Sequence, residues 1–232
     1  MLLALDTSTR QAGIALYDGG RGLVAEYNWY SGHQHTVELM PEIAHLLVQA
    51  GETAAGLSAV AVALGPGSFT GVRVALAAAK GLALARDLPL LGVPTLDVLA
   101  YPHQAETRPV IALLQAGRGR VCWAPYGHGT QGWGSQAPFA LATVAGLAAN
   151  LAGPAVFAGE LSPGDRQMLA EQWGDRVSLL PPALALRRAG YLAEMAWTRL
   201  AAGERADPAN LNPIYLQEPV TFPTRPGTAA GS

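Results

Sequence analysis

Residues 65–73, GPGSFTGVR, lie between two segments of different pattern. Residues 57–65, LSAVAVALG, are continuously apolar, which predicts a strand covered on both faces of its sheet. Residues 69–87 are rich in Ala and Gly around the whole circumference of a predicted helix, which allows close packing on several sides. We therefore expect a buried strand, a glycine loop and a helix in succession.

The loop itself is compatible with two roles. Gly65 and Gly67 would let the backbone approach a ligand, and the backbone N–H groups at the start of the helix would stabilise an anion. Ser68 or Thr70 could cap the helix. The stretch lacks the Lys-Ser/Thr pair that completes the P-loop pattern GxxxxGKS or GxxxxGKT. A phosphate loop and a tight turn with a capped helix both remain open.

The pattern around this loop indicates an α/β fold with an internal repeat. A meander of strands joined by tight turns comes first, and similar strands begin again near residue 103. Strands are predicted at 2–8, 11–18, 22–30, 57–65, 88–94, 109–117, 120–127 and 154–159, and helices at 35–51, 69–87, 95–102, 187–203 and from about residue 139. We therefore predict two related lobes, residues 1–102 and a smaller lobe of residues 103–216. Residues 217–232 contain three prolines and no periodicity, which predicts a disordered tail.

Residues 137–159 resemble a membrane span in composition, because no Asp, Glu, Lys or Arg occurs between Val121 and Gly159. Asn150, Gly153 and Pro154 divide this segment, which predicts an Ala-rich helix followed by a short strand rather than a span. We therefore expect no membrane association.

Composition limits the class of protein. Only 14% of residues are charged, a low fraction that predicts a weakly charged surface for a partner, and the net charge is −2. The nearest approach to basic clusters is two pairs, Arg118 with Arg120 and Arg187 with Arg188, which argues against a protein that binds nucleic acid alone. A single cysteine, Cys122, excludes an internal disulfide and a cysteine zinc cluster, and fits a reducing cytoplasm.

Four motifs together resemble the bacterial TsaB family, also called YeaZ. They are LALDTST (3–9), GPGSFTGVR (65–73) with the following AKGLA, GVPTLDVLA (92–100) and NPIYLQ (212–217). The resemblance implies an actin/Hsp70/sugar-kinase-like (ASKHA) fold with two related lobes. It also implies a non-catalytic subunit that pairs with the related catalytic subunit TsaD in forming threonylcarbamoyladenosine beside the tRNA anticodon. A TsaE-type ATPase would be a further partner, tRNA would be contacted only through the complex, and a homodimer is an additional possibility.

In the catalytic subunit TsaD, to which this family is related, the region just after the second helix resembles a His-x-x-x-His metal-binding motif. Thr95 and Leu99 stand at the corresponding positions here, so we predict no metal site. His33, His35 and His45 do not rebuild one, and no His-Glu-x-x-His motif supports a metallopeptidase of the same superfamily.

ATP chemistry on this fold requires an acid and hydroxyls in the first turn and a later double glycine near the adenosine. Asp6 is present, but Ser8 stands where a glycine is expected, and Gly159 has no adjacent glycine. We therefore expect no resident cofactor, although weak ATP or ADP contact at a subunit boundary is compatible with the sequence. The candidate phosphate-loop residues are Asp6, Ser8, Gly65, Gly67 and Ser68. An ATP-dependent phosphotransferase remains the alternative.

The helix predicted at 35–51 has two apolar rows, one with Val37, Met40, Ala44 and Leu47 and one with Leu39, Ile43, Leu46 and Ala50. We predict that one row of this helix and one of the helix at 69–87 face a partner protein. The candidate contacts are Met40, Leu47, Val72 and Leu76, with Arg73 at the rim. The alternative is that the second lobe covers both rows.

The segment QAGRGRVCWAPY departs from the pattern of the family that the chain resembles. Gln115, Gly117 and Arg120 stand where that family usually has an Asp-Ala-Arg start and a later Glu. This difference predicts either a changed contact role for the second lobe or neutral change in a hairpin.

Overall fold

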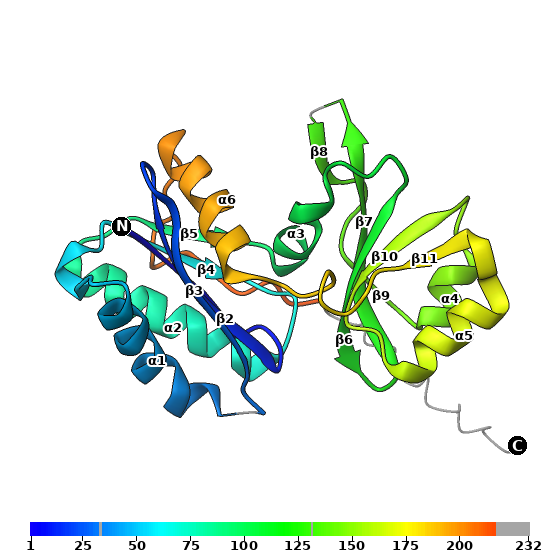
Figure 1. The fold of residues 1–232 in the computed structure, drawn as a ribbon, viewed down its shortest axis with the longest axis horizontal. Helices are drawn as coiled ribbons and strands as arrows, with labels where there is room; N and C mark the ends of the chain where they lie inside the picture. Colours follow the sequence, from blue (N-terminus) through cyan, green and yellow to red (C-terminus); the bar gives the residue numbers. More distant parts are fainter. Residues whose placement is uncertain (33, 131, 217–232) are drawn as a thin grey trace, which may run out of the picture.

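Two mixed β-sheets, each with helices on both faces, lie side by side in the computed structural model (Figure 1). The structure describes residues 1–32, 34–130 and 132–216. The predicted disordered tail, residues 217–232, lies outside the described residues.

The first sheet has the strand order β3-β2-β1-β4-β5. Its first three strands pair antiparallel, which confirms the predicted meander, and β4 and β5 run parallel to β1. The strands are β1 (Leu2–Asp6), β2 (Gln11–Asp18), β3 (Gly22–Tyr30), β4 (Ala59–Ala63) and β5 (Leu90–Val93). β1 and β4 are buried along their whole length, as their continuous apolar runs predict.

Different helices cover the two faces of this sheet. α1 (His35–Gln49) and α2 (Phe69–Arg86) pack on one face, against large aliphatic side chains of β1, β2 and β4. α6 (Ala189–Ala201) packs on the other face, where alanines of β1, β2 and β4 allow a helix to approach closely. In Figure 1, α6 lies across the sheet from α1 and α2.

α6 corrects the predicted division of the chain. It falls within residues 103–216, which we expected to form the second lobe, but it packs on the first sheet. The chain thus returns to the first lobe after completing the second sheet. The amphipathic pattern of a helix predicts that one face is buried but does not say against which sheet.

The second sheet has the order β11-β10-β6-β7-β8, with β9 paired to β7. Its strands are β6 (Val110–Gly117), β7 (Arg120–Gly129), β8 (Gly132–Ser135), β9 (Ala140–Ala142), β10 (Ala155–Gly159) and β11 (Val177–Leu179). α4 (Val144–Ala149) and α5 (Pro163–Trp173) cover one face, and α3 (Thr95–Ala100) packs on the other, between the sheets. Single-turn 3-10 helices occur at Ala54–Gly56, Tyr101–His103 and Gly174–Arg176.

Two helices of the second lobe differ from the prediction. The helix expected from about residue 139 begins at Val144, because residues 140–142 pair with β7 and the Thr143 hydroxyl accepts the Gly146 N–H as a cap. α5 was not predicted, since its apolar residues are few. No helix among the described residues is both long enough and apolar enough to cross a membrane.

Candidate functional site

A cleft of about 920 Å³ lies between the two lobes. Its walls come from the β1–β2 turn, the glycine loop, the β6–β7 hairpin, the end of β10 and the segment before α6. The main residues are Thr9, Arg10, Gln11, Gly67, Ser68, Phe69, Gln115, Glu160 and Arg187. Of the five candidate phosphate-loop residues, Gly67 and Ser68 line this cleft, whereas Asp6, Ser8 and Gly65 are buried and are not among its lining residues.

Asp6, the last residue of β1, is engaged by a cation from the protein itself. Arg187 Nε donates to Asp6 Oδ2 at 2.9 Å, and the exposed fractions of the two side chains are only 3% and 4%. The other carboxylate oxygen, Oδ1, accepts the Ser8 N–H at 2.8 Å. Both oxygens of the acid expected to serve a nucleotide therefore already have internal partners.

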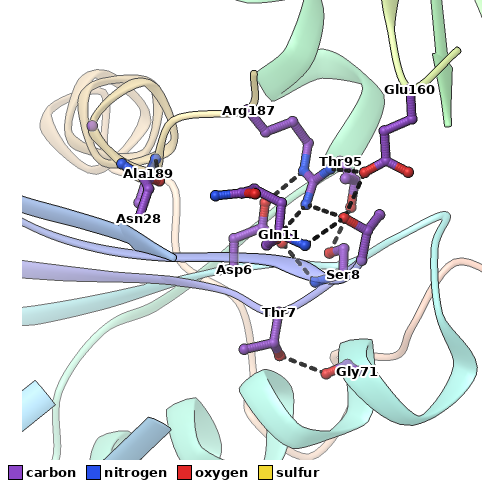
Figure 2. A network of polar contacts seen from close by, with 12 residues as sticks. Asp6, Thr7, Ser8, Gln11, Asn28, Gly71, Thr95, Glu160, Arg187 and Ala189 are labelled. Carbon is purple, nitrogen blue, oxygen red and sulfur yellow. Dashed lines mark hydrogen bonds and ion pairs between the residues drawn. The ribbon is translucent and has the colours of Figure 1, made fainter. Parts of the chain in front are cut away.

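The remaining nitrogens of Arg187 connect the two lobes (Figure 2). Nη2 donates to Thr9 Oγ1 at 3.1 Å and to the Gln11 carbonyl at 3.0 Å, both in the first lobe. Nη1 contacts Glu160 Oε1 at 3.3 Å, at the end of β10 in the second lobe. Thr9 Oγ1 also donates to Glu160 Oε1 at 2.6 Å, so this contact joins the lobes directly.

Electrostatics keep this buried guanidinium charged. Burial disfavours the charged form, but the negative charges of Asp6 and Glu160 outweigh burial and raise the pKa of Arg187 above its usual value. A buried ion pair of this kind is stable only while each polar atom keeps a partner. Arg187, Asp6, Thr9 and Glu160 therefore form one network whose members depend on each other.

The glycines of the loop serve contact with the end of β1. A Cβ on Gly67 would lie 2.3 Å from the Ser8 carbonyl oxygen, and one on Gly71 would lie 2.0 Å from that of Thr7. The Ser68 N–H donates to the Ser8 carbonyl at 2.6 Å, and the Ser68 hydroxyl accepts the Gly71 N–H and caps α2. The loop donor at Ser68 is thus used internally, which favours the tight capped turn over the phosphate loop.

Comparison with known proteins identifies the family of this chain. The sequence model of the TsaD family, described as tRNA N6-adenosine threonylcarbamoyltransferase, matches residues 30–218. The solved structure of YeaZ from Pseudomonas aeruginosa superposes with a TM-score of 0.74 at 29% identity, over 93% of this chain and 99% of that one. The chain belongs to this TsaD-like family, in its TsaB (YeaZ) group.

Curated relatives agree with this assignment. The TsaB protein of Escherichia coli is 37% identical over 54% of both chains, and that of Haemophilus influenzae is 28% identical over 97% of both. The chain therefore spans about half the length of the first of these relatives and nearly all of the second. The predicted α/β ASKHA fold is confirmed for this TsaB-family chain.

Thr95 and Leu99, which stand at the positions of the metal-binding histidines, both lie in the interior of the protein. The buried Thr95 hydroxyl donates to Ser8 Oγ at 3.0 Å, and Leu99 lies in the core of the second lobe. Among the described residues, no group of three His, Cys, Asp or Glu side chains is placed to hold a metal ion. His33 lies outside the described residues, and His35 is buried in the first turn of α1.

Sequence reasoning missed most of the network around Asp6. Arg187 drew notice only as half of a basic pair, because 181 positions separate it from Asp6 and no local pattern connects them. Glu160 carried a weak signal, as an acid directly after a buried strand. Gln115 has a structural role too, since its Nε2 donates to the Glu160 carbonyl at 2.9 Å. The hairpin segment that departs from the family pattern therefore helps to hold the end of β10.

The outer face of α1 and α2 also differs from the sequence prediction. Leu47, Val72 and Leu76 are only 6%, 2% and 6% exposed, so their expected exposure to a partner was wrong. Leu47 and Leu76 pack in the core of the first lobe. Met40 is 48% exposed, and Arg73 is also exposed. On α1 the rest of the first predicted row, Val37, Met40 and Ala44, does face outward, whereas Leu47 is buried together with the second row. Both rows are apolar, so the pattern alone does not show which side chains are buried.

The residues that do face outward form an apolar surface. On α1 they include Val37, Met40, Ala44 and Val48, and on α2 they include Phe69, Arg73 and Ala77. A groove of about 450 Å³ runs between the two helices, with Thr36, Leu39, Met40, Phe69, Thr70, Arg73, Val74, Ala77 and Ala78 as its lining. We call these nine residues the α1/α2 groove.

Proposed function

We propose that this TsaB-family chain is a non-catalytic subunit in the formation of threonylcarbamoyladenosine beside the tRNA anticodon, and that it pairs with a TsaD-type catalytic subunit. The pathway is supported by the relatives from Escherichia coli and Haemophilus influenzae, both named tRNA threonylcarbamoyladenosine biosynthesis protein TsaB. We further propose that it acts in the cytoplasm, with a TsaE-type ATPase as a further partner.

The observation that carries the non-catalytic role is the buried Arg187–Asp6 pair. An ATP-dependent enzyme of this fold would need Asp6 to serve the metal-bound phosphates. Asp6 would have to release Arg187, and breaking a buried pair by removing one partner costs about 3–5 kcal/mol. The alternative of an ATP-dependent phosphotransferase is therefore disfavoured, and the metallopeptidase alternative lacks a ligand set among the described residues.

The docking role rests on the α1/α2 groove. Its lining is mostly aliphatic and aromatic, and Met40 and Phe69 are large side chains exposed on either side of it. Exposed apolar surfaces on two packed helices are typical of protein–protein contacts. We also propose that tRNA is bound only through the complex, since the net charge of the chain is −2. Nucleotide contact at a boundary between subunits is a further part of the proposal.

The test is copurification with the TsaD-type subunit of the same cell. Met40→Glu places an unpaired charge in the groove and should abolish copurification while the melting temperature stays close to that of the wild type. Leu184→Glu is the control, because Leu184 is also an exposed large apolar residue (59%, against 48% for Met40) but lies outside the groove, between β11 and α6, and it should still bind. Binding by Met40→Glu with unchanged affinity would contradict the docking surface.

ATP turnover tests the non-catalytic role separately. The purified chain should hydrolyse ATP no faster than a buffer blank. Turnover that disappears in an Asp6→Asn variant shown by circular dichroism to remain folded would refute the proposal, whereas turnover that persists in this variant would come from a contaminant.

A further inference from the structure

Arg73 is held in a fixed orientation on the wall of the α1/α2 groove. Its guanidinium carbon lies 3.6 Å from the ring centroid of Phe69 and 5.5 Å from that of Tyr215. Nε donates to the Tyr215 hydroxyl at 2.7 Å, and the two rings are 5.4 Å apart. Stacking on aromatic rings together with this hydrogen bond restricts the planar guanidinium before any partner arrives.

The other two nitrogens of Arg73 are left for another group. Within the part of the chain that the structure describes, Nη1 and Nη2 donate no hydrogen bond and Arg73 has no acidic partner. None of the described residues that line the α1/α2 groove is acidic. A docked helix would remove this cation from water, and a desolvated cation without a counter-charge opposes binding.

We propose that Arg73 binds a carboxylate of the docking partner, so that the groove fits an apolar helix of a different protein that carries one Asp or Glu. This inference rests on the proposed function, because it describes the partner that would occupy the groove. A guanidinium offers two parallel N–H donors that match the two oxygens of a carboxylate. Nη1 and Nη2 supply those donors, and the apolar lining of the groove supplies the contact area.

A second copy of this chain fits the same groove poorly. A two-fold symmetric contact places the same surface on both sides, so it brings a second Arg73 and no acid from the lining. The acids of α1 point elsewhere: Glu38 accepts the Trp29 indole N–H at 2.9 Å, and Glu42 lines a separate hollow against β3. Charge therefore favours a heterologous partner over a homodimer.

The experiment measures the affinity of the full chain for the TsaD-type subunit at two salt concentrations. Arg73→Gln should weaken binding about 30-fold or more and make it less dependent on salt, because one desolvated ion pair is lost. Arg73→Lys should have an intermediate effect, since it keeps the charge but not the paired donors. Lys80→Gln removes a cation from α2 outside the groove lining and should bind as the wild type does.

A charge exchange identifies the carboxylate. Arg73→Glu should lose binding, and changing one surface acid of the partner to Lys should restore it, whereas a merely structural role of Arg73 would allow no such rescue. Arg73→Gln with wild-type affinity and salt dependence would overturn the inference while the docking proposal stands. Failure of the wild type to bind would overturn the docking proposal, and the inference with it.

Two further outcomes would also overturn it. Glu218 follows Tyr215 by three positions in the sequence, and loss of binding on Glu218→Gln equal to that of Arg73→Gln would assign the carboxylate to this chain. A homodimer in solution that Arg73→Gln weakens would show that Arg73 serves self-association instead.

Discussion

Arg187 and Arg73 lie in two regions of the molecule that differ in whether acidic side chains neutralise the arginine. Arg187, in the cleft between the lobes, is almost fully buried and bonds to Asp6, Thr9, Gln11 and Glu160. Arg73, on the α1/α2 groove, is exposed and held by rings rather than by acids. A cation with internal partners stabilises the chain itself, whereas one held in place without a counter-charge indicates a contact still to be made.

The same comparison separates the two surfaces as candidate sites. The cleft is the larger hollow, at about 920 Å³, but its acid is already paired. The groove is smaller, at about 450 Å³, yet it leaves apolar side chains and one cation exposed. The state of the charges therefore favours the groove over the larger cleft as the proposed site of interaction.

Leu76→Glu tests the boundary between interior and groove, and its expected effect is the largest. Leu76 packs in the core of the first lobe, so a carboxylate there would be buried without a partner and should cost about 4–5 kcal/mol or more. The variant should be largely unfolded by far-UV circular dichroism. Met40→Glu, on the outer side of the neighbouring helix, should remain folded. A folded Leu76→Glu that only loses its partner would show that the rotation of α2 differs from the one described.

Arg187→Ala tests the paired region itself. It leaves Asp6 buried without its cation, and we expect a loss of about 3–5 kcal/mol in the free energy of unfolding, measured with urea. Arg21→Ala is the control, because Arg21 pairs with Glu52 on the exposed surface, and its unfolding midpoint should hardly change. Equal midpoints for the two variants would show that the buried network adds nothing to stability.

Much of the fold could be predicted from the sequence, because the signals are local. Alternating and continuous apolar runs predicted the strands of the first sheet and β10, and the Ser68 cap was among the expected helix starts. The burial of Leu47 on α1 could not be predicted, since both rows of this helix are apolar. The placement of α6 on the first sheet depends on tertiary packing that no local pattern contains.

The candidate site was harder to predict than the fold. The importance of Asp6 could be inferred from its place at the end of an apolar strand, but its partner Arg187 is 181 positions away. The need for glycine at position 67 could also be inferred, but not that the neighbour would be the Ser8 carbonyl rather than a phosphate. In both cases the sequence indicated the important residue but not the group that it contacts.

The glycine loop allows a matched pair of substitutions on one helix. Gly71→Ala would place a methyl group against the Thr7 carbonyl, so β1 or α2 must shift, and we expect a loss of about 1–3 kcal/mol. Gly81→Ala, on the same helix with no atom within 4 Å of the added carbon, should instead gain about 0.5–1 kcal/mol. Urea unfolding of both variants measures the difference. Two substitutions with the same sign would remove the argument that close packing requires Gly71.

The smallest expected effect concerns a second group of polar contacts, in which Asp97 contacts Tyr126 and Arg199. Asp97, on α3, accepts the Tyr126 hydroxyl at 2.6 Å and lies 3.8 Å from Arg199 of α6. Burial raises the pKa of Asp97 above its usual value, and the hydrogen bond and Arg199 only partly oppose it. The folded chain therefore holds this proton at a pH where the unfolded chain has released it.

Asp97→Asn should remove the pH dependence that follows. With a raised pKa in the folded state, the wild type loses stability as pH rises from about 3.8, the usual value, through the raised pKa. Asn mimics the protonated acid, so the variant should match the wild type at acidic pH and become the more stable of the two towards neutral pH.

Asp18→Asn should show the opposite change of stability with pH. Backbone N–H groups of Arg21 and Gly20 lower the pKa of Asp18, so the stabilisation by ionised Asp18 is lost as pH falls. Urea midpoints of the three proteins between pH 3 and pH 7, about the range in which carboxyl groups titrate, measure both trends. If Asp97→Asn instead becomes less stable than the wild type as pH rises, ionised Asp97 gains more from Arg199 than it loses by burial. Asp97 and Arg199 would then form a stabilising ion pair, as Asp6 and Arg187 do.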